Sequence, residues 1–156
     1  MNIDFIILAA GKGTRMGGDS PKVLASLGGK PMIQHLIDTV DTFQSSKTSI
    51  VVGYKSNEVE RDVVSQKKLR FVKQKNQLGT AHAVKQALPN IRKNSVAVIL
   101  YGDVPLVKKN TLNRLIKSAS KGKLSLLTYI KEDPTGYGRI IRGSRKNVQK
   151  IIEHKD

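Results

Sequence analysis

The sequence is short of three kinds of residue, cysteine, aromatic and acidic, and the first two shortages each exclude a class of protein or site. None of its 156 residues is cysteine, which excludes a disulfide framework and a metal site built from thiolates. Only 4% of the residues are aromatic, too few to form the stacking platforms that hold single-stranded nucleic acids. Acidic residues number 12 against 28 lysines and arginines, so the formal net charge is +16.

This excess of positive charge leaves a polyanion-binding protein as an open alternative. The lysines and arginines are spread through every segment of the chain, however, as they are on an ordinary solvated surface. We therefore expect no specific nucleic-acid partner, and only weak, salt-sensitive binding to polyanions.

The first apolar run, residues 5–10, is too short to cross a bilayer, and residues 1–4 carry no basic flank. Hydrophobic residues make up 38% of the chain and charged residues 26%, which is typical of a soluble globular protein. We therefore expect one cytoplasmic domain with no membrane partner.

Apolar strand-like runs alternate with helical patterns along the chain. The expected strands are 5–10, 50–52, 69–72, 95–101, 124–130 and a pair formed by 139–142 and 148–153. The expected helices lie within 31–43, 57–63, 79–88 and 112–119. Such alternation predicts an α/β fold with a mainly parallel sheet and helices on both faces. In such sheets ligands bind at the carboxyl ends of the strands, and this rule brings the loop after residue 10, Gln74 and Asp103 to one edge.

The loop after the first strand is rich in glycine and positive charge, with Gly11, Lys12, Gly13 and Arg15 followed by Lys22. Backbone N–H groups in such a turn bind anions, although a flexible surface turn remains an alternative. The loop matches neither the dinucleotide fingerprint, which has a glycine where Met16 stands, nor the Walker loop.

Four motifs, taken in order, give the sequence a family likeness. They are L-A-A-G-x-G-T-R-M with a following P-K, Q-L-G-T-A-H-A at 77–83, Y-G-D-V-P-L at 101–106 and D-P-T-G-Y-G-R-I at 133–140. Together they resemble the sugar nucleotidyltransferases, and most closely the uridyltransferase domain of the bifunctional N-acetylglucosamine-1-phosphate uridyltransferase/glucosamine-1-phosphate acetyltransferases.

The resemblance implies an enzyme that joins UTP to N-acetylglucosamine 1-phosphate, giving UDP-N-acetylglucosamine, a peptidoglycan and lipopolysaccharide precursor, and pyrophosphate. It also implies Mg²⁺ as cofactor and a Rossmann-like three-layer α/β/α fold of the nucleotide-diphospho-sugar transferase type. Residues 1–156 would form the N-terminal part of a single nucleotidyltransferase domain, incomplete at its C-terminus. We expect no acetyltransferase β-helix domain, and self-association through the uncovered C-terminal edge.

The resemblance also implies roles for the charged residues. Arg15 and Lys22 would bind the triphosphate and the reacting phosphates, and Asp103 would bind the metal. A surface charge is the alternative for Arg15 and Lys22, and a turn aspartate for Asp103. A phosphate nucleophile is already ionised at neutral pH, so the lack of a Ser/His/Asp set or a carboxylate dyad is no objection. Lys12 is a weaker candidate in the same loop.

The remaining implied contacts are with the nucleoside and the sugar. Gln74, Gly79 and Thr80 would recognise uracil, because an amide offers both a donor and an acceptor and a glycine lets the main chain approach. The alternative for Thr80 is a helix N-cap, for Gly138 a turn and for Glu153 a solvated strand end. We expect no chemical role for the three histidines, His35, His82 and His154. The other nucleotide contacts are expected at Leu8, Ala10, Gly11, Gly13, Tyr101 and Gly102, and the sugar contacts at Gly138 and Glu153.

Three other functions remain open. The chain could be a catalytically incompetent nucleotide-binding fragment, or a subunit that needs a partner chain. It could also be a transferase of the same fold that uses another sugar 1-phosphate or another nucleotide. A polyanion-binding protein is the third.

Overall fold

The computed structural model describes residues 1–13, 19–144 and 147–152. Arg15 and Glu153, two of the expected site residues, therefore lie outside the described residues. The chain divides into two units, Met1–Ser125 and Leu126–Asp156, and each is described by itself.

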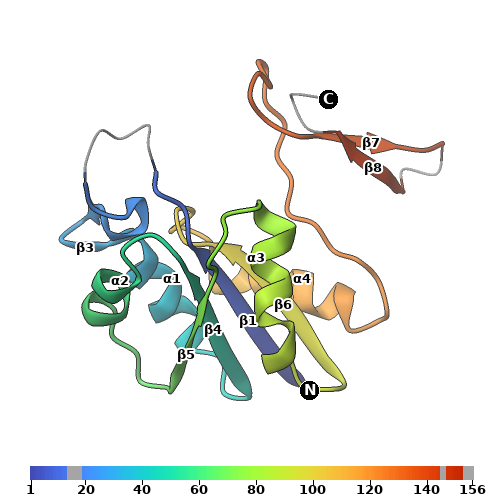
Figure 1. Cartoon of the computed structure of the whole chain (residues 1–156). Helices are drawn as coiled ribbons and strands as arrows, with labels where there is room; N and C mark the ends of the chain where they lie inside the picture. Colours follow the sequence, from blue (N-terminus) through green and yellow to red (C-terminus); the bar gives the residue numbers. More distant parts are fainter. Residues whose placement is uncertain (14–18, 145–146, 153–156) are drawn as a thin grey trace. The chain divides into compact units, whose positions relative to one another are not determined.

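A four-stranded parallel sheet forms the centre of the first unit, with the strand order β5-β4-β1-β6 (Figure 1). Strand β1 pairs with β4 on one side, where Ile7 lies opposite Ile50, and with β6 on the other, where Ile7 lies opposite Leu100. The side chains from Ile3 to Ile7 are buried on both faces of the sheet, as is typical of a central parallel strand. The bounds are β1 (Asn2–Ala9), β4 (Ser46–Val52), β5 (Leu69–Lys73) and β6 (Ser95–Tyr101).

Helices cover both faces of this sheet. Alternate residues of β1 point to opposite faces, so Phe5 and Ile7 pack in one cluster with α1, α2 and α4, and Ile6 packs in another with α3. The expected three-layer α/β/α arrangement is thus confirmed. The helices are α1 (Met32–Asp41), α2 (Ser56–Asp62), α3 (Thr80–Ala87) and α4 (Lys109–Ala119), with 3₁₀ turns η2 (Lys22–Leu24) and η3 (Leu88–Asn90).

The prediction of a strand at 124–130 is wrong. These residues have no regular secondary structure, and Leu124, Leu127 and Ile130 are exposed. A strand needs a neighbour to accept and donate its backbone hydrogen bonds, and no described strand pairs with this segment. An apolar run predicts a preference for burial, but it does not show which neighbour is present.

A small hairpin before α1 was not expected from the sequence. Strands β2 (Ser26–Leu27) and β3 (Lys30–Pro31) pair across Gly28 and Gly29, both of which have positive φ. Pro31 is therefore the N-cap of α1, whereas the expected helix at 31–43 would have had Pro31 as its first residue.

The second unit contains the antiparallel pair expected at 139–142 and 148–153. Strand β7 (Arg139–Arg142) pairs with β8 (Val148–Ile152), with an irregularity between Ile141 and Arg142. Nearby, the rings of Tyr129 and Tyr137 meet edge to face, with centroids 6.0 Å apart.

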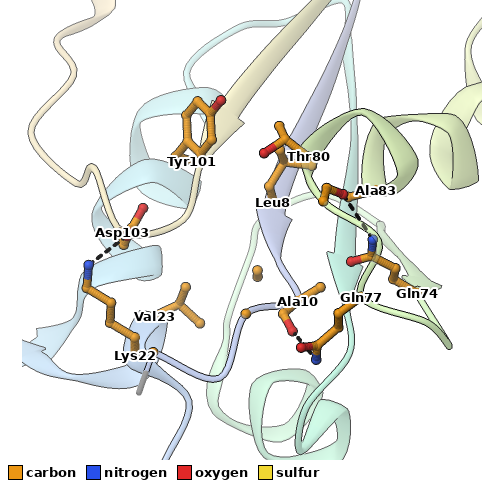
Figure 2. Close-up of a pocket in the computed structure, with 14 residues that line it drawn as sticks. Leu8, Ala10, Lys22, Val23, Gln74, Gln77, Thr80, Ala83, Tyr101 and Asp103 are labelled. Carbon is orange, nitrogen blue, oxygen red and sulfur yellow. Dashed lines mark hydrogen bonds and ion pairs between the residues drawn. The ribbon is translucent and has the colours of Figure 1, made fainter. Parts of the chain in front are cut away.

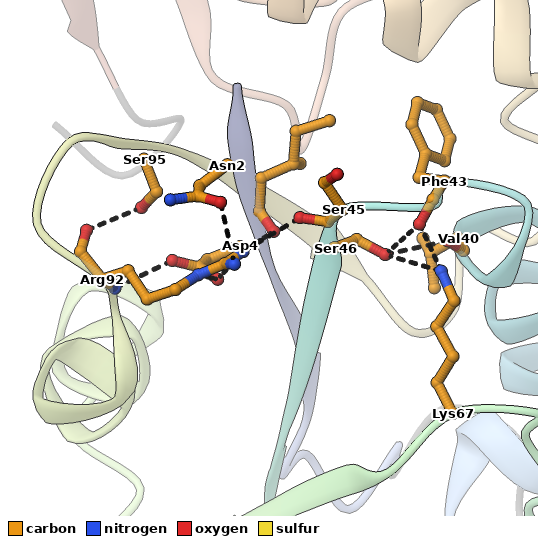
Figure 3. Close-up of polar contacts among 10 residues, drawn as sticks. Asn2, Asp4, Val40, Phe43, Ser45, Ser46, Lys67, Arg92 and Ser95 are labelled. Atoms are coloured by element: carbon orange, nitrogen blue, oxygen red, sulfur yellow. Dashed lines mark hydrogen bonds and ion pairs between the residues drawn. The ribbon is translucent and has the colours of Figure 1, made fainter.

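A buried ion pair stabilises the N-terminal end of β1 (Figure 3). Asp4 is 2% exposed, and its carboxylate accepts hydrogen bonds from the Arg92 backbone N–H at 2.8 Å and from Arg92 Nε at 2.9 Å. Burial raises the pKa of Asp4, but the hydrogen bonds from Arg92 and Ser95 outweigh burial and leave this pKa lowered. Arg92 Nη2 also donates to the carbonyls of Ile3 and Ser45, so this one side chain joins three segments.

Within the described residues, no helix is both long and apolar enough to cross a membrane.

Candidate functional site

A pocket of about 420 Å³ opens at the carboxyl ends of the strands in the first unit (Figure 2). Ten of the expected nucleotide and catalytic residues line it, although they come from four separate stretches of sequence. Four further residues, Ala9, Val23, Gln77 and Ala83, line it as well. The ten expected residues are Leu8, Ala10, Gly11, Gly13, Lys22, Gln74, Gly79, Thr80, Tyr101 and Asp103.

Backbone contacts at the end of β1 fix the floor of this pocket. The Gly102 N–H donates to the Leu8 carbonyl at 2.9 Å, so β6 follows β1 to its last residues. A Cβ at Gly102 would lie 2.9 Å from the Leu8 carbonyl oxygen and 2.9 Å from Val23 Cγ1. Gly102 itself is not among the residues that line the pocket. A glycine is required at this position because β6 approaches β1 too closely for a Cβ.

The glycine loop brings Lys22 close to Gly13. Gly13 has φ +67°, and a Cβ there would clash with Lys22 Cβ. Lys22 opens η2, which is anchored by the buried side chain of Val23. The loop therefore returns onto itself and directs Lys22 toward the end of β6.

Lys22 and Asp103 form an ion pair at one side of the pocket. Lys22 Nζ donates to Asp103 Oδ2 at 2.7 Å, and the two side chains are 38% and 35% exposed. At this exposure an ion pair contributes about 1 kcal/mol or less to stability. Lys22 can therefore exchange Asp103 for another anionic partner at little cost in stability.

Asp103 is also the candidate metal ligand, and the side chains around it can be tested against that role. The described residues hold no group of three or more histidine and acidic side chains that could bind a metal ion by themselves. Mg²⁺ in nucleotide sites usually keeps one or two carboxylates and takes its other ligands from phosphates and water. A single half-exposed carboxylate beside the glycine loop fits an ion that binds together with the polyphosphate of a nucleotide.

The weaker candidate Lys12 does not line the pocket. Its Nζ lies 5.1 Å from the centre of the Tyr54 ring, in a cation–π contact. At the far end of the same loop, Asp19 accepts hydrogen bonds from Lys55 Nζ at 2.7 Å and from the Tyr54 hydroxyl at 2.8 Å. The hydrogen bonds from Lys55 and Tyr54 lower the pKa of Asp19. Both ends of the loop thus contact the segment that follows β4.

Gln74 and the start of α3 form the opposite wall. Gln74 is 5% exposed, and its Nε2 donates to the Gly79 carbonyl at 3.2 Å and contacts His82 Nδ1 at 2.9 Å. Gly79 is the N-cap of α3, with φ +91°, and Thr80 is the first helical residue. The alternative interpretation of Thr80 as a helix N-cap is therefore wrong.

Two hydrogen-bond contacts at the pocket were not expected from the sequence. Gln77 Nε2 donates to the Ala10 carbonyl at 2.9 Å, which holds the loop before α3 against the end of β1. His82 contacts Gln74, although no histidine was expected to act in the site. Both residues lie in the motif at 77–83, whose spacing alone does not indicate which side chains turn inward.

The expected sugar contacts are not placed at this pocket. Gly138 lies in the second unit, next to β7, and Glu153 lies outside the described residues. Arg15, expected to bind phosphates, also lies outside the described residues. The roles of these three residues remain predictions.

Comparison with known proteins places this geometry in context. A family model for MobA-like NTP transferase domains matches residues 5–145. The chain is 46% identical over 154 residues to the bifunctional protein GlmU of Cellvibrio japonicus, and 48% identical over 157 residues to that of Nitrosomonas eutropha. These matches cover 99% and 100% of this chain but 34% of each relative, so the chain spans about a third of their length.

Among solved structures, HddC of Yersinia pseudotuberculosis has the same fold. Its TM-score is 0.71 at 23% sequence identity, over 96% of this chain and 68% of that one.

Proposed function

The chain belongs to the family of MobA-like NTP transferase domains, and from this premise we propose that it binds UTP and transfers its uridylyl group to N-acetylglucosamine 1-phosphate. The four sequence motifs support this choice, because they resemble those of the uridyltransferases that make UDP-N-acetylglucosamine. The likeness to two proteins named GlmU supports it as well.

The reaction is a displacement at phosphorus. A phosphate oxygen of the sugar 1-phosphate bonds to the α-phosphorus of UTP, the bond from that phosphorus to the β-bridging oxygen breaks, and pyrophosphate leaves with the electron pair. The nucleophile needs no general base, because it is already ionised. The main obstacle is repulsion between anions, since two unit charges 4 Å apart repel by about 4 kcal/mol at an effective dielectric of about 20. The protein must therefore supply positive charge and alignment.

The observation that carries the proposal is the meeting of Lys22 and Asp103 beside Gly11 and Gly13 in one pocket. Lys22 is held at the pocket by a half-exposed ion pair, and it turns to the phosphates when they arrive. Gly11 and Gly13 let the backbone approach the same phosphates. Arg15 adds a second cation from the same loop.

Asp103 would hold the Mg²⁺ that accompanies UTP. When bound, the ion supplies positive charge to the phosphate oxygens. Without the ion, the Asp103 carboxylate would repel the triphosphate, and Lys22 is the residue that balances its charge.

The nucleoside occupies the other side of the pocket. Gln74, Gly79 and Thr80 recognise the base, while Leu8, Ala10 and Gly11 contact the nucleoside through their backbone and Tyr101 lies at the rim. Gly138 and Glu153 contact the sugar.

The experiment is a pyrophosphate-release assay with UTP, N-acetylglucosamine 1-phosphate and Mg²⁺. We expect Asp103→Asn to lower the rate by about 100-fold or more, as expected when one charge-stabilising group is lost. The matched control Asp62→Asn removes an exposed carboxylate that pairs with Arg61, and it should leave the rate unchanged. Equal rates for the wild-type protein and Asp103→Asn would refute the role of Asp103.

The same samples separate the other candidate functions. Binding of UTP without release of pyrophosphate would restrict the function to nucleotide binding. Faster turnover with another sugar 1-phosphate or another nucleoside triphosphate would change the substrate but keep the reaction.

A further inference from the structure

A network of hydrogen bonds behind the pocket fixes the side chain of Gln74. Gln74 Nε2 lies 3.2 Å from the Gly79 carbonyl oxygen and 2.9 Å from His82 Nδ1. The second ring nitrogen of His82, Nε2, lies 3.1 Å from Gln86 Nε2, one helical turn further along α3. The Gly79 carbonyl also accepts the Ala83 N–H at 3.1 Å, which closes the first turn of the helix.

Counting hydrogens determines the orientation of the Gln74 amide. The amide nitrogen carries two hydrogens, and the Gly79 carbonyl can only accept, so one hydrogen is directed to Gly79. The second is directed to His82 Nδ1, which must then be the unprotonated nitrogen of a neutral imidazole. The hydrogen of His82 consequently lies on Nε2. Gln86 Nε2 lies 3.1 Å from that atom, and an amide nitrogen only donates, so the Gln86 amide has to turn by 180° to accept this hydrogen with its oxygen.

The opposite orientation is unfavourable at Gly79. Rotating the Gln74 amide by 180° would place its oxygen against the Gly79 carbonyl oxygen, a contact between two acceptors. Gly79 therefore sets the orientation of the amide, and His82 Nδ1 accepts its second hydrogen.

This orientation leaves Gln74 Oε1 for the pocket. Figure 2 shows the amide oxygen on the side of the pocket and the amide nitrogen joined by a dashed line to the start of α3. Gln74 lines the pocket, and among the described residues its Oε1 is not one of the fully enclosed side-chain atoms without a partner. Because both amide hydrogens are used within the protein, Gln74 offers a ligand an acceptor and no donor.

We infer that His82 is a specificity-determining residue, which acts by holding the Gln74 amide so that the pocket accepts a hydrogen bond from the base. The inference rests on the proposed function, because it concerns the base of the same nucleotide. Uracil carries a hydrogen on its N3 and can donate it to Gln74 Oε1. Cytosine has a lone pair at that position, which would face the Gln74 oxygen without a hydrogen between them. His82 thereby selects a uracil nucleotide against its cytosine counterpart.

The test compares the affinities for UTP and CTP, measured by titration calorimetry in the presence of Mg²⁺. The wild-type chain should prefer UTP by about tenfold or more, and His82→Phe should reduce this ratio by about tenfold, the value of one net hydrogen bond. The matched control His35→Phe changes a histidine of α1 whose Nε2 contacts the Leu27 carbonyl at 2.8 Å, and it should keep the wild-type ratio. A purely structural effect of His82→Phe would weaken both nucleotides equally.

The outcomes separate the two proposals. If the wild-type chain prefers UTP and His82→Phe keeps that preference in full, the inference about His82 is overturned while the proposed function stands. If the wild-type chain binds neither nucleotide, the proposed function and this inference fall together.

A second measurement needs no variant. The ¹⁵N spectrum of the neutral His82 ring in the wild-type protein should show the hydrogen on Nε2. A hydrogen on Nδ1 would overturn the inference.

Discussion

At the scale of single residues, the site depends on how closely its parts approach one another. Gly13 has a positive φ and lies against the Cβ of Lys22, so it is required both by the backbone and by its neighbour. Gly122 has a positive φ of +74° as well, but a Cβ there would meet nothing within 4 Å. A comparison of substitutions at Gly13 and Gly122 can therefore distinguish the effect of backbone strain, present at both, from the effect of a steric clash, present only at Gly13.

Replacing Gly13 by alanine should therefore displace Lys22 from Asp103. We expect Gly13→Ala to lower the free energy of unfolding by about 1–3 kcal/mol, because strain and a clash act together. We also expect the affinity for UTP to fall by about tenfold, as misplacement of a phosphate-binding cation implies. Equilibrium unfolding in urea and titration calorimetry measure the two effects.

Gly122→Ala serves as the control for Gly13→Ala. It should cost about 1 kcal/mol of stability through strain alone and leave UTP binding unchanged. If Gly13→Ala bound UTP as tightly as the wild-type protein, the placement of Lys22 would not matter for the nucleotide.

Much of the site could be predicted residue by residue, because chemistry-bearing side chains follow directly after apolar strands. Asp103 after β6 and Gln74 after β5 are examples, and the topology brings them to one pocket. His82 could not be predicted in the same way. Its contact with Gln74 depends on how α3 is rotated, which the spacing of the motif does not determine.

At the scale of elements, the sheet is stabilised at the end opposite the pocket by Asp4 and Arg92 (Figure 3). The pKa of Asp4 is lowered in the folded protein, so its contribution to stability is present above the unfolded-state pKa of about 4. That contribution is lost as the pH falls through the lowered pKa. The ion pair therefore favours folding at neutral pH and not in acid.

Asp4→Asn tests this pH dependence. At pH 7 we expect the free energy of unfolding to fall by about 1–3 kcal/mol, because Asp4 and the partly exposed Arg92 lose a charge-assisted hydrogen bond. Below pH 4 the difference between the variant and the wild-type protein should narrow, because the unfolded chain then binds a proton at Asp4, and the narrowing is complete once the pH is below the lowered pKa of the folded state. Urea unfolding at a series of pH values measures this difference, and a difference that is constant with pH would contradict the account.

The elements also show where sequence patterns stop being informative. The runs at 50–52 and 95–101 form strands because β1 lies beside them and pairs with both. The similar run at 124–130 has no such neighbour among the described residues and forms no strand. An apolar run predicts a tendency to form a buried strand, but a strand forms only where a neighbouring strand can pair with it.

At the scale of the whole molecule, the charge distribution is uneven. The net charge is +16, and residues 104–131 contain no acidic residue at all. Within that stretch Arg114 and Lys117 lie exposed on α4, while Leu112 and Ile116 of the same helix face the core. Such a surface attracts any polyanion without selecting a sequence.

Binding to a single-stranded RNA should therefore be weak and sensitive to salt. We expect its affinity to fall by at least about tenfold between about 50 and 200 mM salt, as release of counterions requires. Fluorescence anisotropy with a labelled oligonucleotide measures this. Tight RNA binding that survives 200 mM salt, with no competition by UTP, would instead support the alternative of a polyanion-binding protein.

The central claim is that the opening glycine loop, the start of α3 and Asp103 hold one nucleotide in one pocket. The most direct measurement is a two-dimensional ¹H–¹⁵N NMR titration of the chain with UTP and Mg²⁺. We predict that the amide signals of Gly11, Gly13, Gly79 and Asp103 shift together and saturate at one concentration. Shifts confined to the basic residues of α4, with the signals of the pocket unchanged, would contradict the claim.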